Sequence, residues 1–212
     1  METSSIPRKK IAIDIDDVLG DCVGGLIKYC QDIHNRTLAR SAFVSYHFER
    51  VLGGPKEAAL EVLRDYTNSS HFAHIEPLPG AKEGVADLQR TFALYCLTSR
   101  RQGDPHKQIT LDWLARHFPD SFCEVCFGYN EYTQTGPTLT KAQICAQKGI
   151  DWIVEDSLEN ALRFTAESAT SIILIDAPWN QSSERYDHIQ RVKDWLEVVR
   201  TIRTLENRLP AS

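Results

Sequence analysis

Five short apolar runs, most of which end in acidic or hydroxyl side chains, constrain the fold of this sequence more than any other feature. The runs occupy residues 10–15, 92–97, 123–127, 152–154 and 171–175. Strands that are apolar throughout are typical of a parallel sheet that is covered on both faces. We therefore expect these runs to be buried strands of one parallel sheet.

Amphipathic patterns lie between the apolar runs and predict helices. Where strands alternate with helices, the chain forms an α/β sheet with right-handed crossovers. This predicts a Rossmann-like parallel sheet flanked by helices. The expected helices cover residues 80–90, a segment that starts with Asp104 as cap and Pro105 as first residue, residues 140–148, residues 158–167 with Ser157 as cap, and residues 189–202.

One interval after the first run is too long for a simple crossover. About 60 residues separate the first strand from the helix that precedes the second, whereas a crossover needs roughly a dozen. Residues 21–34 and 55–66 within it have helical patterns. We therefore predict a small helical cap over residues 21–77, inserted after the first strand of a core that comprises residues 8–20 and 78–205.

The polar residues cluster where the predicted strands end. In open α/β sheets, ligands bind beyond the carboxyl ends of the strands. Converging carboxylates repel one another and stay ionised only beside a cation, and oxygen-only ligands favour Mg²⁺. The sequence therefore predicts a magnesium site at this edge. The residues that reach it are Asp14, Asp16 and Asp17 after the first strand, Thr98 and Ser99 after the second, and Glu155 and Asp156 after the fourth.

Lys141, at the start of the predicted helix 140–148, adds a positive charge to this set. A lysine, a metal and hydroxyl donors suit phosphoryl transfer, where stabilising spread negative charge is most of the catalytic task. A carboxylate in the set can attack phosphorus, and a second carboxylate two residues along can protonate the leaving oxygen and then activate water.

Four segments of the sequence resemble the motifs of the haloacid dehalogenase (HAD) superfamily. Residues 11–21, IAIDIDDVLGD, resemble the first motif, and TSR at 98–100 resembles the second. Lys141 fits the third motif, and the acidic pair at 155–156 fits the fourth. All four occur in the order that the superfamily has, which implies an HAD-like core and an HAD-type hydrolase.

The chain is more specifically similar to the 5′(3′)-deoxyribonucleotidase family. The resemblance covers residues 14–29, DIDDVLGDCVGGLIKY, which include Asp21 and a Gly pair. That family has a small helical cap after the first motif, as predicted here. The segment 176–180, DAPWN, also resembles related nucleotidase-like proteins. Asp17 is a departure, because many relatives have Gly at this position.

The resemblance implies a role for each candidate residue. Asp14 would be the nucleophile and a metal ligand. Asp16 would be the general acid and base, and would bind the metal through its backbone carbonyl. The remaining roles would be metal binding by Asp156, positioning of the metal's waters by Glu155, binding of the phosphoryl oxygens by Thr98 and Lys141, and substrate contact by Ser99 and Arg100.

These roles predict a magnesium-dependent phosphomonoester hydrolase that forms an aspartyl-phosphate. The resemblance favours a 5′-nucleotidase that acts on (deoxy)nucleoside monophosphates. Two alternatives stay open: a phosphatase for another small metabolite, such as a sugar phosphate, and a non-catalytic binding protein on the same fold. Dehalogenation is disfavoured, because dehalogenases require neither the magnesium site nor the Asp16 acid and base. Phosphomutase activity stays open.

Two groups of residues, one in the cap and one after the last predicted strand, each allow two interpretations. The cap residues could stack on a nucleobase or could form the core of the cap, and Trp179 and Asn180 could line the cleft or belong to a structural loop. The cap residues in question are Phe43, Tyr46, His47, Phe48 and Phe72.

The cysteines predict no metal or redox centre. Cys96, Cys123 and Cys126 lie in strand-like runs, where a buried free thiol is the expected state. A zinc site would require further cysteines or histidines at ligand spacing near the C-x-x-C pair, and a redox pair usually opens a helix.

The net charge of −5 gives no general attraction for nucleic-acid polymers or anionic membranes. No apolar run approaches the roughly 20 residues that span a bilayer, and the N-terminus lacks the apolar stretch of a secretory signal. We expect a cytoplasmic protein whose partner is a small phosphorylated metabolite. A homodimer is compatible with the resemblance.

Overall fold

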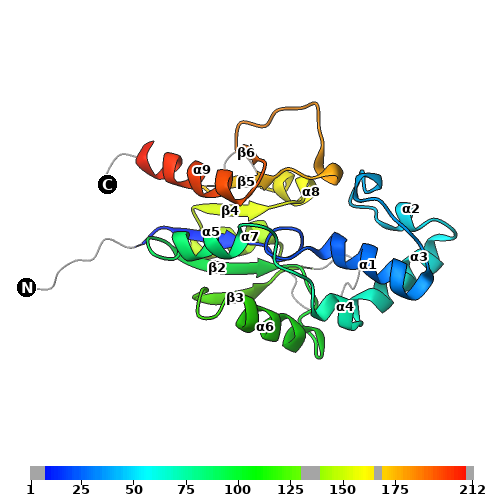
Figure 1. Cartoon of the computed structure of the whole chain (residues 1–212). Helices are drawn as coiled ribbons and strands as arrows, with labels where there is room; N and C mark the ends of the chain where they lie inside the picture. Colours follow the sequence, from blue (N-terminus) through cyan, green and yellow to red (C-terminus); the bar gives the residue numbers. More distant parts are fainter. Residues whose placement is uncertain (1–7, 130–138, 165–168, 209–212) are drawn as a thin grey trace, which may run out of the picture.

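Six parallel strands form one sheet in the order β3-β2-β1-β4-β5-β6. The computed structural model describes residues 8–129, 139–164 and 169–208, and the statements below concern these residues. The sheet confirms the predicted parallel α/β fold (Figure 1). The strands are β1 (Lys10–Ile13), β2 (Ala93–Thr98), β3 (Glu124–Phe127), β4 (Trp152–Glu155), β5 (Ser171–Ile175) and β6 (Ile189–Val192).

Helices cover both faces of the sheet because alternate strand residues point to opposite sides. Ile11 and Ile13 of β1 belong to one buried cluster, and Ala12 between them belongs to another. The first cluster packs against α5 (Ala81–Leu88), α6 (His106–His117) and α9 (Trp195–Arg208). The second packs against α7 (Lys141–Lys148) and α8 (Leu158–Leu162). The central strands β1, β4 and β5 are therefore buried along nearly their whole length, as the sequence pattern indicates, whereas β6 at the edge has an exposed middle.

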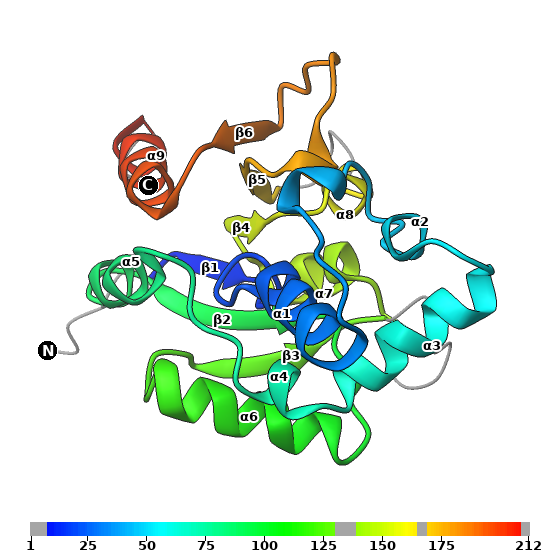
Figure 2. The ribbon, with the colours of Figure 1, turned by 45° about the vertical axis from the view of Figure 1, so that its right-hand side comes forward.

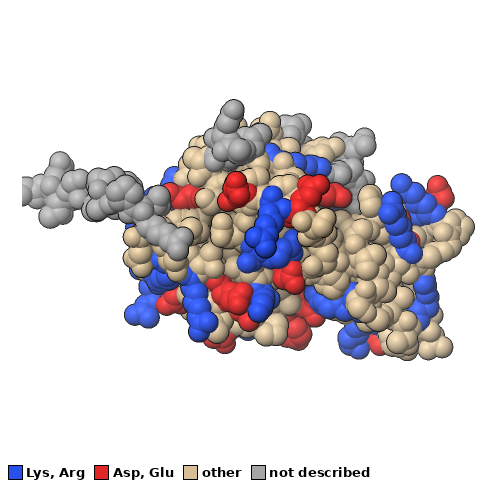
Figure 3. Space-filling view, turned by 90° about the horizontal axis from the view of Figure 1, so that it is seen from above, with Lys and Arg blue, Asp and Glu red and all other residues tan. Residues whose placement is uncertain are grey.

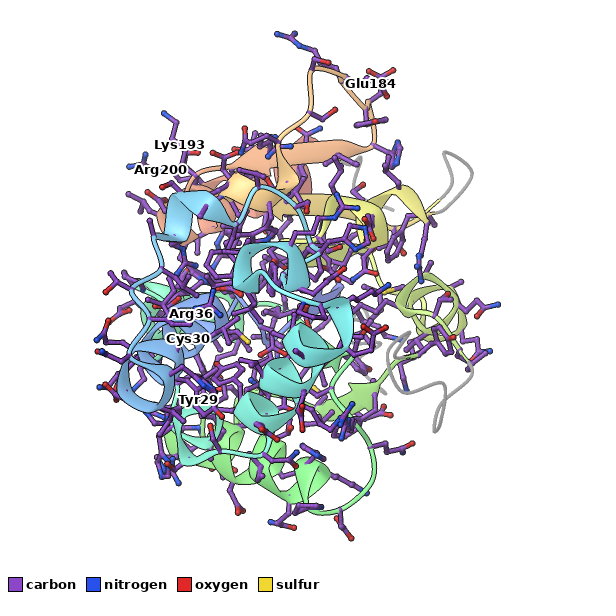
Figure 4. All side chains as sticks on the ribbon, turned by 90° about the vertical axis from the view of Figure 1, so that its right-hand side faces the viewer. Tyr29, Cys30, Arg36, Glu184, Lys193 and Arg200 are labelled. Atoms are coloured by element: carbon purple, nitrogen blue, oxygen red, sulfur yellow. The ribbon has the colours of Figure 1, made fainter. Side chains whose placement is uncertain are left out.

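Residues 21–77, here named the cap segment, form helices beyond the carboxyl ends of the strands. Figures 1 and 2 show them together at one end of the sheet, and Figure 4 shows them in front of it. A third buried cluster joins them, with Leu26, Phe43 and Tyr66 among its members. The boundaries of a separate cap domain stay a prediction. The elements are α1 (Cys22–His34), η1 (Arg40–Ala42), α2 (Glu49–Leu52), α3 (Lys56–Thr67) and α4 (Ser70–Ala73).

The glycine pair of α1 allows two cap helices to approach closely. A Cβ atom at Gly25 would lie 2.5 Å from the hydroxyl oxygen of Tyr66 on α3. That hydroxyl donates a hydrogen bond of 2.7 Å to the carbonyl of Cys22. Asp21 caps the helix by accepting the Gly24 N–H at 3.0 Å. The start of α1 is therefore fixed close to the end of β1.

The predicted helix over residues 189–202 was wrong in its first part. Ile189–Val192 is the edge strand β6, which pairs with β5, and the helix α9 begins at Trp195. Apolar residues at Ile189 and Val192 fit a helical spacing, but the backbone of these residues pairs with the edge of β5 instead. Pairing with β5 therefore decided between the two structures.

Two further local predictions were wrong. Pro105 occupies the N-cap position of α6 without a side-chain cap, so Asp104 does not cap this helix. Cys123 is exposed, because β3 begins one residue later, whereas Cys96 and Cys126 are buried as expected. The other predicted helices are present with ends that differ by one or two residues, except α8. This helix ends at Leu162, well before the predicted residue 167, which itself lies outside the described residues.

Acidic and basic side chains alternate over the face that Figure 3 shows. No broad patch of one charge dominates that face, in keeping with the small net charge of the chain. Within the described residues, no helix has the length and apolar character that crossing a bilayer requires.

Candidate active site

The carboxyl ends of β1, β2 and β4 bring the predicted residues together. β1 lies between β2 and β4 in the sheet. Asp14 follows β1 directly, and its N–H donates to the carbonyl of Val154 on β4 at 3.1 Å. Thr98 and Glu155 are the last residues of β2 and β4. Adjacent parallel strands therefore place side chains from three distant parts of the sequence at one edge.

Three buried carboxylates converge at this edge. Asp14, Glu155 and Asp156 each offer an oxygen, and these oxygens lie within 4.8 Å of one another. Asp14 is 5% exposed, and Glu155 and Asp156 are fully buried. The structure thus brings Asp14 and Asp156 together, as the magnesium prediction requires. The side chain of Asp16 is not part of this group, and the predicted ligand from Asp16 is its backbone carbonyl.

Lys141 supplies the positive charge beside these carboxylates. Its Nζ lies 2.6 Å from Oδ2 of Asp14 and 2.5 Å from Oε1 of Glu155. Burial opposes the charge of Lys141, but the two carboxylates raise its pKa above the ordinary value. Lys141 is the first residue of α7, whose start is fixed by a capping box between Thr140 and Gln143.

Backbone donors hold the Glu155 side chain in place. Its Oε2 accepts the N–H groups of Asp156 and Ser157, each at 3.1 Å. Its Oε1 accepts from Lys141 and, at 3.3 Å, from the side chain of Asn160. Glu155 is therefore a fixed acceptor that orients the lysine beside Asp14.

Burial raises the pKa values of the other carboxyl groups. It raises the pKa of Asp14 to about 7, although Lys141 acts in the opposite direction. It also raises the pKa of Asp156 well above the ordinary value, with a further contribution from Glu155. A divalent cation at this edge would favour the ionised forms of both groups.

Arg100 pairs with Asp16 in this structure. Nη2 of Arg100 lies 2.6 Å from Oδ1 of Asp16, and Nε lies 3.0 Å from Oδ2. The Arg100 side chain is 3% exposed, and its guanidinium lies 4.3 Å from the ring centroid of Phe72. Among the described residues, Nη1 is buried and has no hydrogen-bond partner. The predicted substrate contact of Arg100 is therefore occupied by Asp16 here.

Thr98 and Ser99 differ in their exposure. Thr98 is fully buried, and its hydroxyl accepts the N–H of Arg100 at 3.1 Å. Ser99 lines the cavity described below. The structure therefore places both hydroxyl groups at the end of β2, where the sequence predicts them.

A cavity of about 360 Å³ opens from this edge towards the cap segment. A volume of this size suits a small metabolite. Asp14, Asp16 and Lys141 lie at one end. Arg64, Arg101, Arg163 and His106 add positive or titratable groups to the lining. The apolar side chains from the cap segment that line it are Leu26, Tyr46, Phe48, Leu60, Leu63, Tyr66 and Phe72.

The cap aromatics divide between the two interpretations. Phe43 is fully buried in the core of the cap segment. Tyr46, Phe48 and Phe72 line the cavity, where they could contact a substrate. His47 points instead to Glu49, with Nδ1 3.4 Å from Oε1.

Asp17 and Arg40 join the first motif to the cap segment. Nη2 of Arg40 lies 2.9 Å from Oδ1 of Asp17, and Arg40 also pairs with Asp21. Asp17 has a φ of 54°, in the region that favours glycine, and its carboxylate accepts the N–H of Val23 at 3.2 Å. These two contacts compensate for the unfavourable backbone conformation of Asp17.

Sequence reasoning missed two cap contacts. The first is Arg40 with Asp17, and the second is the Tyr46 hydroxyl, which lies 3.2 Å from both carboxylate oxygens of Asp156. Partners 23 and 110 residues apart follow no local periodicity. The cap composition alone gives no signal for them.

Without metal, the protein is expected to lose stability as the pH rises. Burial raises the pKa of Asp17 to about 8 and that of Asp14 to about 7, whereas both groups ionise near pH 4 in the unfolded chain. Folding therefore takes up protons in this window, and the resulting stability is lost as the pH rises through the folded pKa values. Urea unfolding in EDTA at pH 5.5 and pH 8.5 measures the difference.

Two controls belong to this measurement. Asp17→Asn should weaken the pH dependence, because it removes the group with the higher folded pKa. Magnesium should weaken it as well, because a cation favours the ionised carboxylates. A metal-free protein that gains stability between these two pH values would contradict the expectation.

Comparison with known proteins gives one family and many related structures. A model of the family described as "5′ nucleotidase, deoxy (Pyrimidine), cytosolic type C protein" matches residues 8–209. The 5′(3′)-deoxyribonucleotidase of Bacillus subtilis (strain 168) is 21% identical over 198 residues, which are 92% of this chain and 99% of that protein.

Two solved structures have the same fold. A haloacid dehalogenase-like hydrolase from Streptococcus pneumoniae superposes with a TM-score of 0.61 at 14% identity, covering 92% of this chain and 98% of its own. An HAD-type hydrolase from Bacillus subtilis, solved with magnesium bound, has a TM-score of 0.58 at 13% identity, covering 93% and 99%.

Proposed function

Because the chain belongs to the family of the cytosolic type C deoxy (pyrimidine) 5′-nucleotidases, which are phosphatases of the HAD superfamily, we propose that it hydrolyses nucleoside 5′-monophosphates. The family supports a small nucleotide as substrate. Beyond this, we propose that the substrate carries its phosphate at the 5′ position of the nucleoside, that magnesium is required, and that an aspartyl-phosphate intermediate forms. The observation that carries it is the convergence of Asp14, Asp156 and Lys141 at the carboxyl ends of the strands, where Asp14 and Lys141 line the cavity.

The donor set at this edge fits a magnesium ion. Asp14, Glu155 and Asp156 offer three carboxylates, and Lys141 offsets one negative charge, so a divalent cation would balance the remaining two. All three donors are oxygens, which Mg²⁺ prefers. Asp14 and Asp156 would hold the ion together with the backbone carbonyl of Asp16. When bound, magnesium neutralises charge on the phosphoryl oxygens and on the carboxylates around them.

Asp14 would form the covalent intermediate. Its Oδ1 accepts the Ile15 N–H at 2.8 Å, and its Oδ2 lies beside Lys141. The carboxylate is therefore held in one orientation before the substrate arrives. It would attack phosphorus as the bond to the nucleoside oxygen breaks, and water would then hydrolyse the aspartyl-phosphate. Lys141 and Thr98 would hold the phosphoryl oxygens.

Asp16 would transfer the protons, two residues from the nucleophile. It would protonate the leaving oxygen and later take a proton from the attacking water. In this structure its carboxylate pairs with Arg100, whose Nη2 lies 2.6 Å from Oδ1. If the substrate draws Arg100 away from Asp16, the Asp16 carboxyl group becomes free to contact the leaving oxygen, and Arg100 gains the substrate contact that the sequence predicts.

The apolar wall of the cavity supports a nucleotide over a smaller polar substrate. The rings of Tyr46 and Phe48 stack on each other, with centroids 5.4 Å apart and an interplanar angle of 27°. Phe72 also lines the cavity. An aromatic ring that stacks on a base contributes roughly 1–3 kcal/mol. A sugar phosphate would leave most of this apolar surface without a partner.

Phosphate release from a substrate panel tests the proposal. The panel contains nucleoside 5′-monophosphates, 3′-monophosphates and sugar phosphates, each with Mg²⁺ and with excess EDTA. We expect turnover of 5′-monophosphates with Mg²⁺, loss of turnover in EDTA, and recovery when Mg²⁺ is restored. If only sugar phosphates are hydrolysed, the substrate assignment is wrong, and if turnover persists in EDTA, the magnesium assignment is wrong.

A further inference from the structure

The short turn after β5 reaches the acidic edge of the sheet and contacts Asp156. This turn is η2 (Pro178–Asn180), within the segment DAPWN that the sequence singled out. Trp179 is 6% exposed and Asn180 is 1% exposed, so both polar groups have to find partners inside the protein. Both find one at Asp156.

The indole of Trp179 binds the carboxylate of Asp156 directly. Its Nε1 donates to Oδ2 of Asp156 at 2.7 Å. Tyr46 also approaches this carboxylate, but its hydroxyl lies 3.2 Å from each oxygen. The shorter bond is the stronger one, so Trp179 determines the orientation of the carboxylate more than Tyr46 does.

Asn180 fixes the backbone on which Asp156 is carried. Its Nδ2 donates to the carbonyl of Asp156 at 2.8 Å and to the carbonyl of Ile175 at 2.7 Å. Its Oδ1 accepts the Ala177 N–H at 3.1 Å and Nη1 of Arg191, from β6, at 2.6 Å. One side chain therefore ties the ends of β4, β5 and β6 together.

We propose that Trp179 and Asn180 are positioning residues that hold Asp156 for the divalent metal ion. The inference rests on the proposed function, because Asp156 is a metal ligand only there. Hydrogen bonds to a ligating carboxylate orient it, and loss of such a partner typically weakens metal affinity by about 10–100-fold. The Trp179 bond engages Oδ2, whereas the contact to Oδ1 among the described residues is the 3.2 Å one from Tyr46, which an ion can displace.

Trp179 also connects the metal edge to the cap segment. The guanidinium of Arg40 lies 5.3 Å from its ring centroid, and the ring of Phe48 lies 6.0 Å away at an angle of 75°. A phenylalanine in place of Trp179 keeps an aromatic surface for these contacts but removes the N–H. Trp179→Phe is therefore a narrow test of the bond to Asp156.

The experiment measures metal binding without substrate. Mg²⁺ is titrated calorimetrically into the wild type and Trp179→Phe, and free Mn²⁺ is counted by electron paramagnetic resonance as a second probe. We expect the dissociation constant of the variant to rise about 10–100-fold. An unchanged dissociation constant in a folded variant would overturn the inference. A wild type that binds neither ion would overturn the proposed function, and the inference with it.

Trp195→Phe is the matched control. Its indole N–H also makes a buried hydrogen bond of 2.8 Å, but to the backbone carbonyl of Val18 and not to a carboxylate. Its loss should leave the metal dissociation constant unchanged. The activity of Trp179→Phe should recover when the Mg²⁺ concentration is raised, whereas a misfolded variant would not recover. Activity that stays low at saturating Mg²⁺, with unchanged metal affinity, would also overturn the inference.

Discussion

Replacement of Asp14 by asparagine is expected to lower kcat by at least about 10⁴-fold. The amide cannot attack phosphorus, so no aspartyl-phosphate forms, and loss of an enzyme's nucleophile commonly costs on the order of 10⁴–10⁶ in kcat. The measurement is phosphate release from the best nucleotide of the panel. Trapping with beryllium fluoride, which mimics the phosphorylated carboxylate, should fail in this variant and succeed in the wild type.

The variant Asp14→Asn should fold as well as the wild type. Burial already raises the pKa of Asp14 to about 7, so the charge is costly in the metal-free protein, and its removal is expected to maintain or raise thermal stability. Lys141 keeps its bond to Glu155. A low activity in a stable variant would therefore show that the substitution impairs the chemical step and not the folding of the protein.

Asp176→Asn is the control for this substitution. Asp176 follows β5 as Asp14 follows β1, but its side chain is 42% exposed and pairs with Arg191. We expect its kcat to stay close to that of the wild type. If Asp14→Asn retains more than about a tenth of the wild-type kcat, a nucleophilic role for this residue is wrong.

The second large effect is expected for Lys141→Met, in both stability and turnover. Lys141 is 5% exposed and lies between Asp14 and Glu155. Methionine has a similar length but leaves two buried carboxylates without their cation, and breaking a buried pair in this way costs about 3–5 kcal/mol in the free energy of unfolding. Turnover should fall strongly as well, because the phosphoryl oxygens lose a positive charge.

Lys148→Met is the matched control on the same helix. Lys148 is the last residue of α7 and pairs with Glu124 at 2.7 Å, but the two side chains are 29% and 50% exposed. Exposed pairs contribute at most about 1 kcal/mol. Urea unfolding of both variants in EDTA at neutral pH measures the contrast. Equal losses of stability in the two variants would contradict a special role for the buried lysine.

The sequence was sufficient to predict the parts of this protein that depend on local pattern. Apolar runs such as residues 10–15 and 171–175 gave the buried parallel strands, and polar residues after them marked the edge where Asp14, Glu155 and Asp156 meet. This works because side-chain alternation and the direction of parallel strands place every strand end on one side of the sheet.

Local pattern was insufficient where tertiary pairing overrode it. Ile189 and Val192 have the spacing of one helix face, but they pack on opposite faces of the sheet, because pairing with β5 made this segment a strand. Cys123 belongs to an apolar run, but the register of β3 with β2 begins at Glu124 and leaves the thiol exposed.

The tertiary structure alone decided which polar groups bind one another at the site. The pairs Arg100 with Asp16, Arg40 with Asp17 and Trp179 with Asp156 are 84, 23 and 23 residues apart in the chain. A sequence pattern reports the environment that a residue needs, such as burial or a strand end. The partner of a buried charge or donor depends on the order of the strands and on the packing of the cap segment, which bring distant residues within a hydrogen bond's length.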